Sequence, residues 1–195
     1  MKNILILFFA LLFNTTIHAQ TISYEDFKAI IPSIEKEDFK ETFDITNKLL
    51  STTQNDSSEL RGIVIYMNIF SSAGMVTSDQ MTYDAFSKNA QKYLGQQLVM
   101  PAHPCIDSSA NGFNSLQFIT KNGTIQGTTT TSNNTQTNIL CFEYFKFAAP
   151  VNPADFIGKD VRCGGILTSV EPNPNKSKIW ICRLHFDNAF ARTLN

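Results

Sequence analysis

The sequence predicts an α+β fold, in which N-terminal antiparallel helices pack on a C-terminal antiparallel, strongly coiled β-sheet or partly open barrel. Between residues 20 and 95, apolar residues recur at helical spacing. From residue 96 to 195, β-branched and aromatic residues dominate short segments, and Asn122-Gly123 separates two of them. We therefore expect a helical region at 20–95 and a β-rich region at 96–195, either as one compact unit or as two small domains.

The first 19 residues have the pattern of a cleavable secretory signal. Lys2 precedes an apolar run from Ile4 to Phe13, and Ala19 is the expected last residue before cleavage. No later segment reaches the roughly 20 apolar residues that a membrane-spanning helix needs. The sequence thus predicts an exported, periplasmic or secreted protein that does not span a membrane.

Four helices are expected in the region 20–95. Ser23 and Asp26 have the spacing of a capping box at the start of the first helix. The second is expected from about Ser33 to Leu50 with one apolar face. The remaining two are expected from Ser57 or Ser58 to near Gly74, and from a cap at Thr77 or Ser78 to Gly95.

Three strands are expected before residue 150. Asn-Gly between β-rich flanks predicts a hairpin of 115–121 and 124–131. The aromatic-rich segment 138–147 is typical of a central strand. The threonine-rich stretch 128–137 indicates an edge strand with a loose end, or alternatively a surface loop.

A last hairpin is expected from segments 160–170 and 177–187. Alternation places Cys163 and Cys182 on its buried face and places Arg162, Arg183 and His185 on the other face. Gly164-Gly165 predicts a bulge that bends the strand. The three outward residues are candidates for an anion-binding patch, the alternative being a solvated strand face.

Four cysteines follow the signal segment: Cys105, Cys141, Cys163 and Cys182. In an exported protein an even number of cysteines suggests disulfides, and four cysteines allow three pairings. All four are disulfide candidates. The alternative is that some are small buried apolar side chains.

The segment Asn152–Val161, followed by Cys163-Gly164-Gly165-Ile166, resembles the opening of an OB-fold of the anticodon-binding-like type. Such folds bind oligonucleotides, oligosaccharides or protein segments, so the resemblance implies an OB-like binding module. Only residues 188–195 follow the last hairpin. The remaining strands of such a fold must therefore come from upstream, which departs from the standard order.

Charge and chemistry disfavour nucleic acid as a partner. Without Lys2 the chain has 16 − 1 = 15 basic residues against 17 acidic ones, and no aromatic residue lies among the three outward hairpin residues to stack on bases. The sequence therefore indicates an unknown protein, or a small anionic or saccharide ligand.

The chain contains none of the common hydrolase or redox motifs, and no metal or cofactor site is expected. No residue is assigned a catalytic role. The leading hypothesis is an exported, non-enzymatic binding or assembly module that uses the open face of the last hairpin. One alternative is a small extracytoplasmic hydrolase organised around His103, Asp107 and His185. Another is a disulfide-stabilised structural protein.

Overall fold

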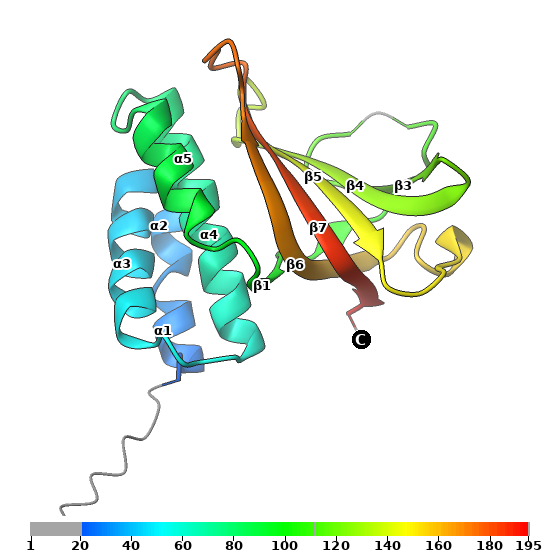
Figure 1. Ribbon diagram of the computed structural model, residues 1–195, viewed down its shortest axis with the longest axis horizontal. Helices are drawn as coiled ribbons and strands as arrows, with labels where there is room; N and C mark the ends of the chain where they lie inside the picture. The colour runs from blue at the N-terminus through cyan, green and yellow to red at the C-terminus, as the bar shows by residue number, and fades with distance from the viewer. Residues whose placement is uncertain (1–20, 111, 195) are drawn as a thin grey trace, which may run out of the picture.

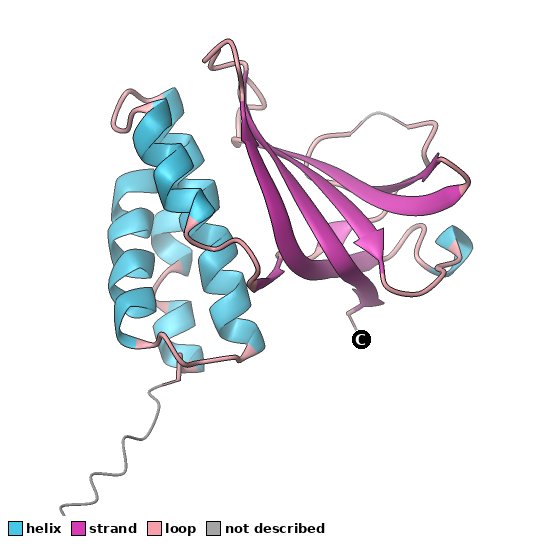
Figure 2. Ribbon diagram, in the orientation of Figure 1, coloured by secondary structure: helices cyan, strands magenta, loops and turns pink. Residues whose placement is uncertain are grey.

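The structure is a computed structural model that describes residues 21–110 and 112–194. Figure 1 shows the helices on one side of the molecule and the sheet on the other, and Figure 2 separates the two classes of element by colour. The α+β class is confirmed. The expected signal segment, residues 1–19, lies outside the described residues.

The first helices are shorter than expected. Helix α1 spans Tyr24–Lys28, and the capping box between Ser23 and Asp26 is confirmed. The single helix expected over residues 33–50 is in fact two, α2 (Ile31–Glu35) and α3 (Phe39–Thr52). The break has a local cause: Glu37 adopts a left-handed backbone with φ of 55°, and Asp38 caps the N-terminus of α3.

The next two helices begin at serine or threonine caps. Helix α4 spans Glu59–Thr77 with the expected cap at Ser58. Helix α5 spans Tyr83–Gln91 and is capped by Thr82, not by Thr77 or Ser78. Among the described helices, α4 is long and apolar enough to cross a membrane by length and composition, but 78% of its apolar window is buried inside the protein. That burial is what a core helix requires.

Seven strands form one sheet in the described part of the chain. They are β1 (Gln97–Val99), β2 (His103–Pro104), β3 (Leu116–Lys121), β4 (Thr124–Ser132), β5 (Ile139–Phe147), β6 (Asp160–Pro172) and β7 (Trp180–Thr193). Their order is β1-β6-β7-β5-β4-β3, and β2 also pairs with β6. Strands β5 and β7 are parallel, so the sheet is mixed and the expectation of a purely antiparallel sheet is wrong. The sheet is not closed into a barrel, since β1 and β3 end the strand order.

The hairpin of β3 and β4 is confirmed. Asn122 and Gly123 form its turn with φ of 52° and 74°, the left-handed pair that a two-residue hairpin turn requires. Strand β4 pairs with β5 on its other side, so β4 is an interior strand and the expected edge position is wrong. The edge strand on this side of the sheet is β3.

The hairpin of β6 and β7 is confirmed, and it contains two bulges that offset each other in register. One register shift lies between Gly164 and Ile166, where a bulge is expected, but its extra residue is in β7. The second lies between Leu167 and Ser169. At Gly164 a Cβ atom would lie 2.7 Å from the Leu98 carbonyl oxygen, so β1 can approach β6 only because this residue is glycine.

Candidate functional site

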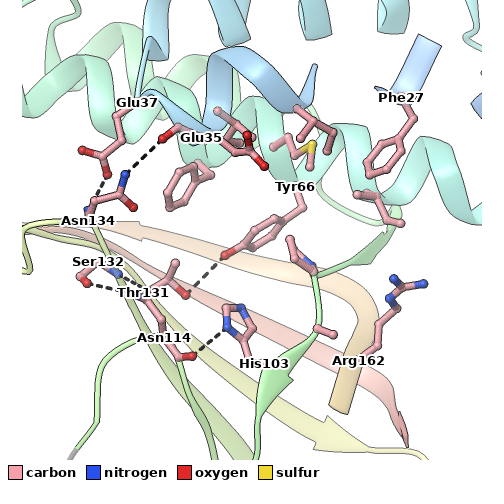
Figure 3. Close-up of a pocket in the computed structure, with 17 residues that line it drawn as sticks. Phe27, Glu35, Glu37, Tyr66, His103, Asn114, Thr131, Ser132, Asn134 and Arg162 are labelled. Atoms are coloured by element: carbon pink, nitrogen blue, oxygen red, sulfur yellow. Dashed lines mark hydrogen bonds between the residues drawn. The ribbon is translucent and has the colours of Figure 1, made fainter. Parts of the chain in front are cut away.

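A cleft of about 410 Å³ lies between the helices and the sheet. Figure 3 shows helical side chains along one wall and side chains from the sheet and its loops along the other. The first wall is apolar. It consists of large side chains from α1, α2 and α4: Phe27, Ile31, Ile34, Ile63, Met67 and Phe70.

The opposite wall is polar. Its side chains come from β2, β4 and the adjoining loops: His103, Asn114, Thr131, Ser132 and Asn134. Charged groups lie at two separate places, with Glu35 and Glu37 near one end and Arg162 near the other. A cleft with one apolar and one polar wall suits a small molecule that is itself amphipathic.

The turn between β4 and β5 holds the two walls together at the acidic end. The backbone N–H of Asn134 donates to Glu37 Oε1, and Asn134 Nδ2 donates to the carbonyl oxygen of Glu35 at 3.4 Å. The left-handed backbone of Glu37 makes this geometry possible because it ends α2 and turns the chain toward the sheet.

His103 presents an unsatisfied hydrogen-bond acceptor. Its Nδ1 lies 3.0 Å from the carbonyl oxygen of Asn114. Burial lowers the pKa of His103, which favours the neutral ring. Because a carbonyl oxygen can only accept, Nδ1 carries the proton and Nε2 is left with a free lone pair. Nε2 is buried and has no hydrogen-bond partner among the described residues.

Tyr66, another lining residue, connects the cleft to a buried carboxyl group behind it. The Tyr66 hydroxyl donates to Glu143 Oε1 at 2.9 Å, and the hydroxyl groups of Thr129 and Thr131 donate to Oε2. Burial raises the pKa of Glu143 to about 7, although these hydrogen bonds act in the opposite direction. Burial also raises the pKa of Tyr66 well above its usual value, so Tyr66 remains a donor at neutral pH.

The structure separates Arg162 from Arg183 and His185, the other two residues expected to form an anion-binding patch. Arg162 lies opposite Arg192 near one end of the hairpin and forms an ion pair with Glu59 at 3.0 Å. Arg183 lies opposite Glu171 near the other end, with its guanidinium 4.5 Å above the centre of the Trp180 ring.

His185 lies opposite Ser169. Its Nε2 is 3.3 Å from Glu171 Oε1, and its ring stacks on Tyr144 at 5.0 Å between centroids. Only Arg162 of the three lines the cleft, and an anion-binding role for the set stays a prediction.

The residues of the hydrolase hypothesis have separate partners. Asp107 is exposed and accepts two hydrogen bonds from Ser109, which hold the pKa of its carboxyl below the usual range. It lines a different, smaller pocket from the one that contains His103. In the described part of the chain no hydrogen bond joins any two of His103, Asp107 and His185.

The four cysteines are free and buried in this structure. Cys163 lies opposite Ala191 and Cys182 opposite Pro172, at opposite ends of the hairpin. Both are buried, but they lie far apart along the hairpin. Among the described residues no group of three or more His, Cys, Asp or Glu side chains is arranged to hold a metal ion.

The carboxyl group of Glu143 is the site feature that the sequence did not suggest. It occupies an alternating buried position in β5, and its two neighbours along the strand on that face, Cys141 and Phe145, are apolar. One acidic residue inside an aromatic-rich strand is itself a signal, because carboxylates are almost never fully buried without partners. Tyr66 gave no comparable signal, because an aromatic residue within an apolar helix is ordinary.

Comparisons of the chain with protein-family models, with curated proteins and with solved structures find no match in any of the three.

Proposed function

We propose that this protein is an exported, non-enzymatic binding module that takes a small, mostly apolar molecule bearing a hydrogen-bond donor into the cleft between the helices and the sheet. The observation that carries this proposal is the buried Nε2 of His103, which has no hydrogen-bond partner among the described residues and belongs to a cleft whose other wall is apolar. A ligand N–H or O–H would satisfy that acceptor, while its apolar part would cover the helical side chains. The signal pattern of the first 19 residues supports export.

The cleft is a better candidate than the open face of the last hairpin. A binding site gains most from concave shape and from polar groups that converge on one ligand. The Arg183 guanidinium instead lies over the Trp180 ring, and the His185 ring stacks on Tyr144 beside Glu171. The hydrolase hypothesis has less support. Catalysis needs a base held near its nucleophile and its orienting group, and no hydrogen bond joins any two of His103, Asp107 and His185 among the described residues.

A fluorescent probe tests the proposal directly. N-phenyl-1-naphthylamine is apolar and carries a single N–H donor, and it fluoresces on leaving water. We expect saturable binding to the purified protein. His103→Phe keeps a flat ring but removes the acceptor, and it is expected to weaken binding about 3- to 10-fold, the value of one neutral hydrogen bond.

Two further variants locate the probe. Ile34→Trp fills the cleft from α2 at a half-buried position and is expected to abolish saturable binding. His185→Phe changes a histidine outside the cleft and serves as the matched control, with unchanged affinity. Equal affinity in all three variants and the wild type, or the absence of saturable binding, would overturn the proposal.

A further inference from the structure

Cys141 and Cys182 lie side by side on neighbouring strands. They are Cα partners in the parallel register of β5 and β7, and their Sγ atoms are 3.6 Å apart. Both side chains are wholly buried. Adjacent strands bring paired Cα atoms to about 5 Å, within the range that a disulfide bridges.

The surroundings of the pair keep the Cys141 sulfur as a thiol once the sheet has formed. The hydrogen bond with Cys182, together with burial and the nearby Glu143, raises the pKa of Cys141 well above its usual value. Cys182 Sγ also lies 3.5 Å from the carbonyl oxygen of Leu140. Buried thiols of this kind do not react with oxidants in solution, so any oxidation must accompany folding.

From this geometry we propose that Cys141 and Cys182 form a cross-strand disulfide when the chain folds in an oxidising compartment. The link joins β5 to β7, which are the parallel neighbours of the described sheet. It therefore attaches the C-terminal hairpin covalently to the centre of the sheet. The inference is independent of any ligand in the cleft.

The oxidant is a small or protein-borne disulfide. One cysteine thiolate attacks a sulfur of that disulfide, forms a mixed disulfide and releases one thiol. The second cysteine then attacks the mixed disulfide, and the S–S bond between Cys141 and Cys182 forms as the second thiol leaves. The two cysteines lose two protons and two electrons, and the oxidant gains both as two thiols.

The other two cysteines lie elsewhere in the fold. Cys163 lies opposite Ala191 in the β6–β7 hairpin, and the backbone N–H of Cys105 donates to the carbonyl oxygen of Lys159. Neither is a register partner of Cys141 or Cys182. The geometry thus selects Cys182 as the partner of Cys141 among the three pairings that the sequence leaves open.

Peptide mapping of the full chain tests this pairing. The reduced, unfolded protein is refolded in a mixture of oxidised and reduced glutathione, quenched with acid, and then unfolded in denaturant, where remaining thiols are blocked with iodoacetamide. Trypsin then releases the four cysteines in separate peptides, residues 93–121, 122–146, 163–176 and 179–183. We expect peptide 122–146 linked to peptide 179–183, and a rise in Tm of about 10 °C over the reduced protein.

Carbamidomethylated Cys141 and Cys182 in the refolded protein, or a link from either one to Cys105 or Cys163, would overturn the proposal. Variants give a second measurement. Cys182→Ala is expected to lose the oxidation-dependent rise in Tm, whereas Cys105→Ala, a buried cysteine outside the pair, retains it. The reverse result contradicts the proposal, and the wild-type peptide map decides the matter if Cys182→Ala does not fold.

Discussion

The hydroxyl of Tyr66 on α4 donates a hydrogen bond of 2.9 Å to the carboxyl group of Glu143 on β5. This contact joins the core helix to the centre of the sheet directly behind the cleft. Both side chains are almost completely buried, and Thr129 and Thr131 complete the partners of the carboxyl group. A carboxyl group in this environment is more stable when protonated, because burial penalises its charged form.

Glu143 is expected to make the protein less stable as the pH rises. Its pKa is about 7 in the folded protein, against an ordinary value of 4.5. Between these values the folded state binds more protons than the unfolded state. The contribution of Glu143 to the free energy of unfolding is therefore fully present below pH 4.5 and declines by about 3 kcal/mol as the pH rises through 7.

Urea denaturation of the wild type and of Glu143→Gln, measured from pH 4.5 to 8.5, checks this prediction. Glu143→Gln should lack the decline. The free energy of unfolding of the wild type should therefore fall relative to that of the variant as the pH rises. Glu41→Gln, at an exposed glutamate on α3, is the control and should follow the wild type. Parallel curves for the wild type and Glu143→Gln would contradict the argument.

Asn68 is expected to be essential to the helical layer. It accepts hydrogen bonds from Asn89 at 2.8 Å and from Tyr93 at 3.2 Å, and it donates to Thr46 at 3.0 Å. Asn68→Ala leaves buried partners unsatisfied and should lower the free energy of unfolding by about 2–4 kcal/mol. The measurement is chemical denaturation. Asn55→Ala, at an exposed position, should change the free energy of unfolding by less than about 0.5 kcal/mol.

Local signals in the sequence predicted the elements that local chemistry determines. The Ser23 capping box, the Ser58 cap and the Asn122-Gly123 hairpin are each confirmed, because a few neighbouring residues suffice to specify them. The glycine pair at 164–165 likewise predicted the position of a bulge, although the extra residue lies in β7.

The parallel pairing of β5 and β7 could not be predicted in this way. It pairs Cys141 with Cys182, which the whole of β6 separates in the sequence, and alternation within a strand says nothing about which distant strand lies beside it. Within the hairpin, Cys163 and Cys182 lie at opposite ends, opposite Ala191 and Pro172. His103 could be named as a candidate because histidine is a common functional residue type. The contact between Tyr66 and Glu143 could not be predicted, because it depends on tertiary packing.

The turn between β3 and β4 provides a test of backbone strain without a change in packing. Gly123 has φ of 74°, and an added Cβ would have no atom within 4 Å. Gly123→Ala should therefore destabilise the protein only through its left-handed backbone, by about 1–2 kcal/mol in the free energy of unfolding. Asn122→Gly, where φ is 52°, should be tolerated. Thermal denaturation measures the loss of stability in each variant. Equal losses in Gly123→Ala and Asn122→Gly would contradict the prediction.

Gly74 and Phe39 fix the distance between α4 and α3. A Cβ added at Gly74 would overlap the Phe39 ring, which packs directly over the glycine. Gly74→Ala should lower the free energy of unfolding by about 1–3 kcal/mol, even though alanine favours a helix by about 1 kcal/mol over glycine.

A double-mutant cycle separates the steric clash from the helix propensity. Phe39→Leu alone opens a small cavity and is destabilising. In the Phe39→Leu background, Gly74→Ala no longer meets an aromatic ring, so its effect should fall to near zero or become stabilising. Strict additivity of the two substitutions would show that the ring does not oppose the added methyl group, and the close packing of α3 on α4 would then need another explanation.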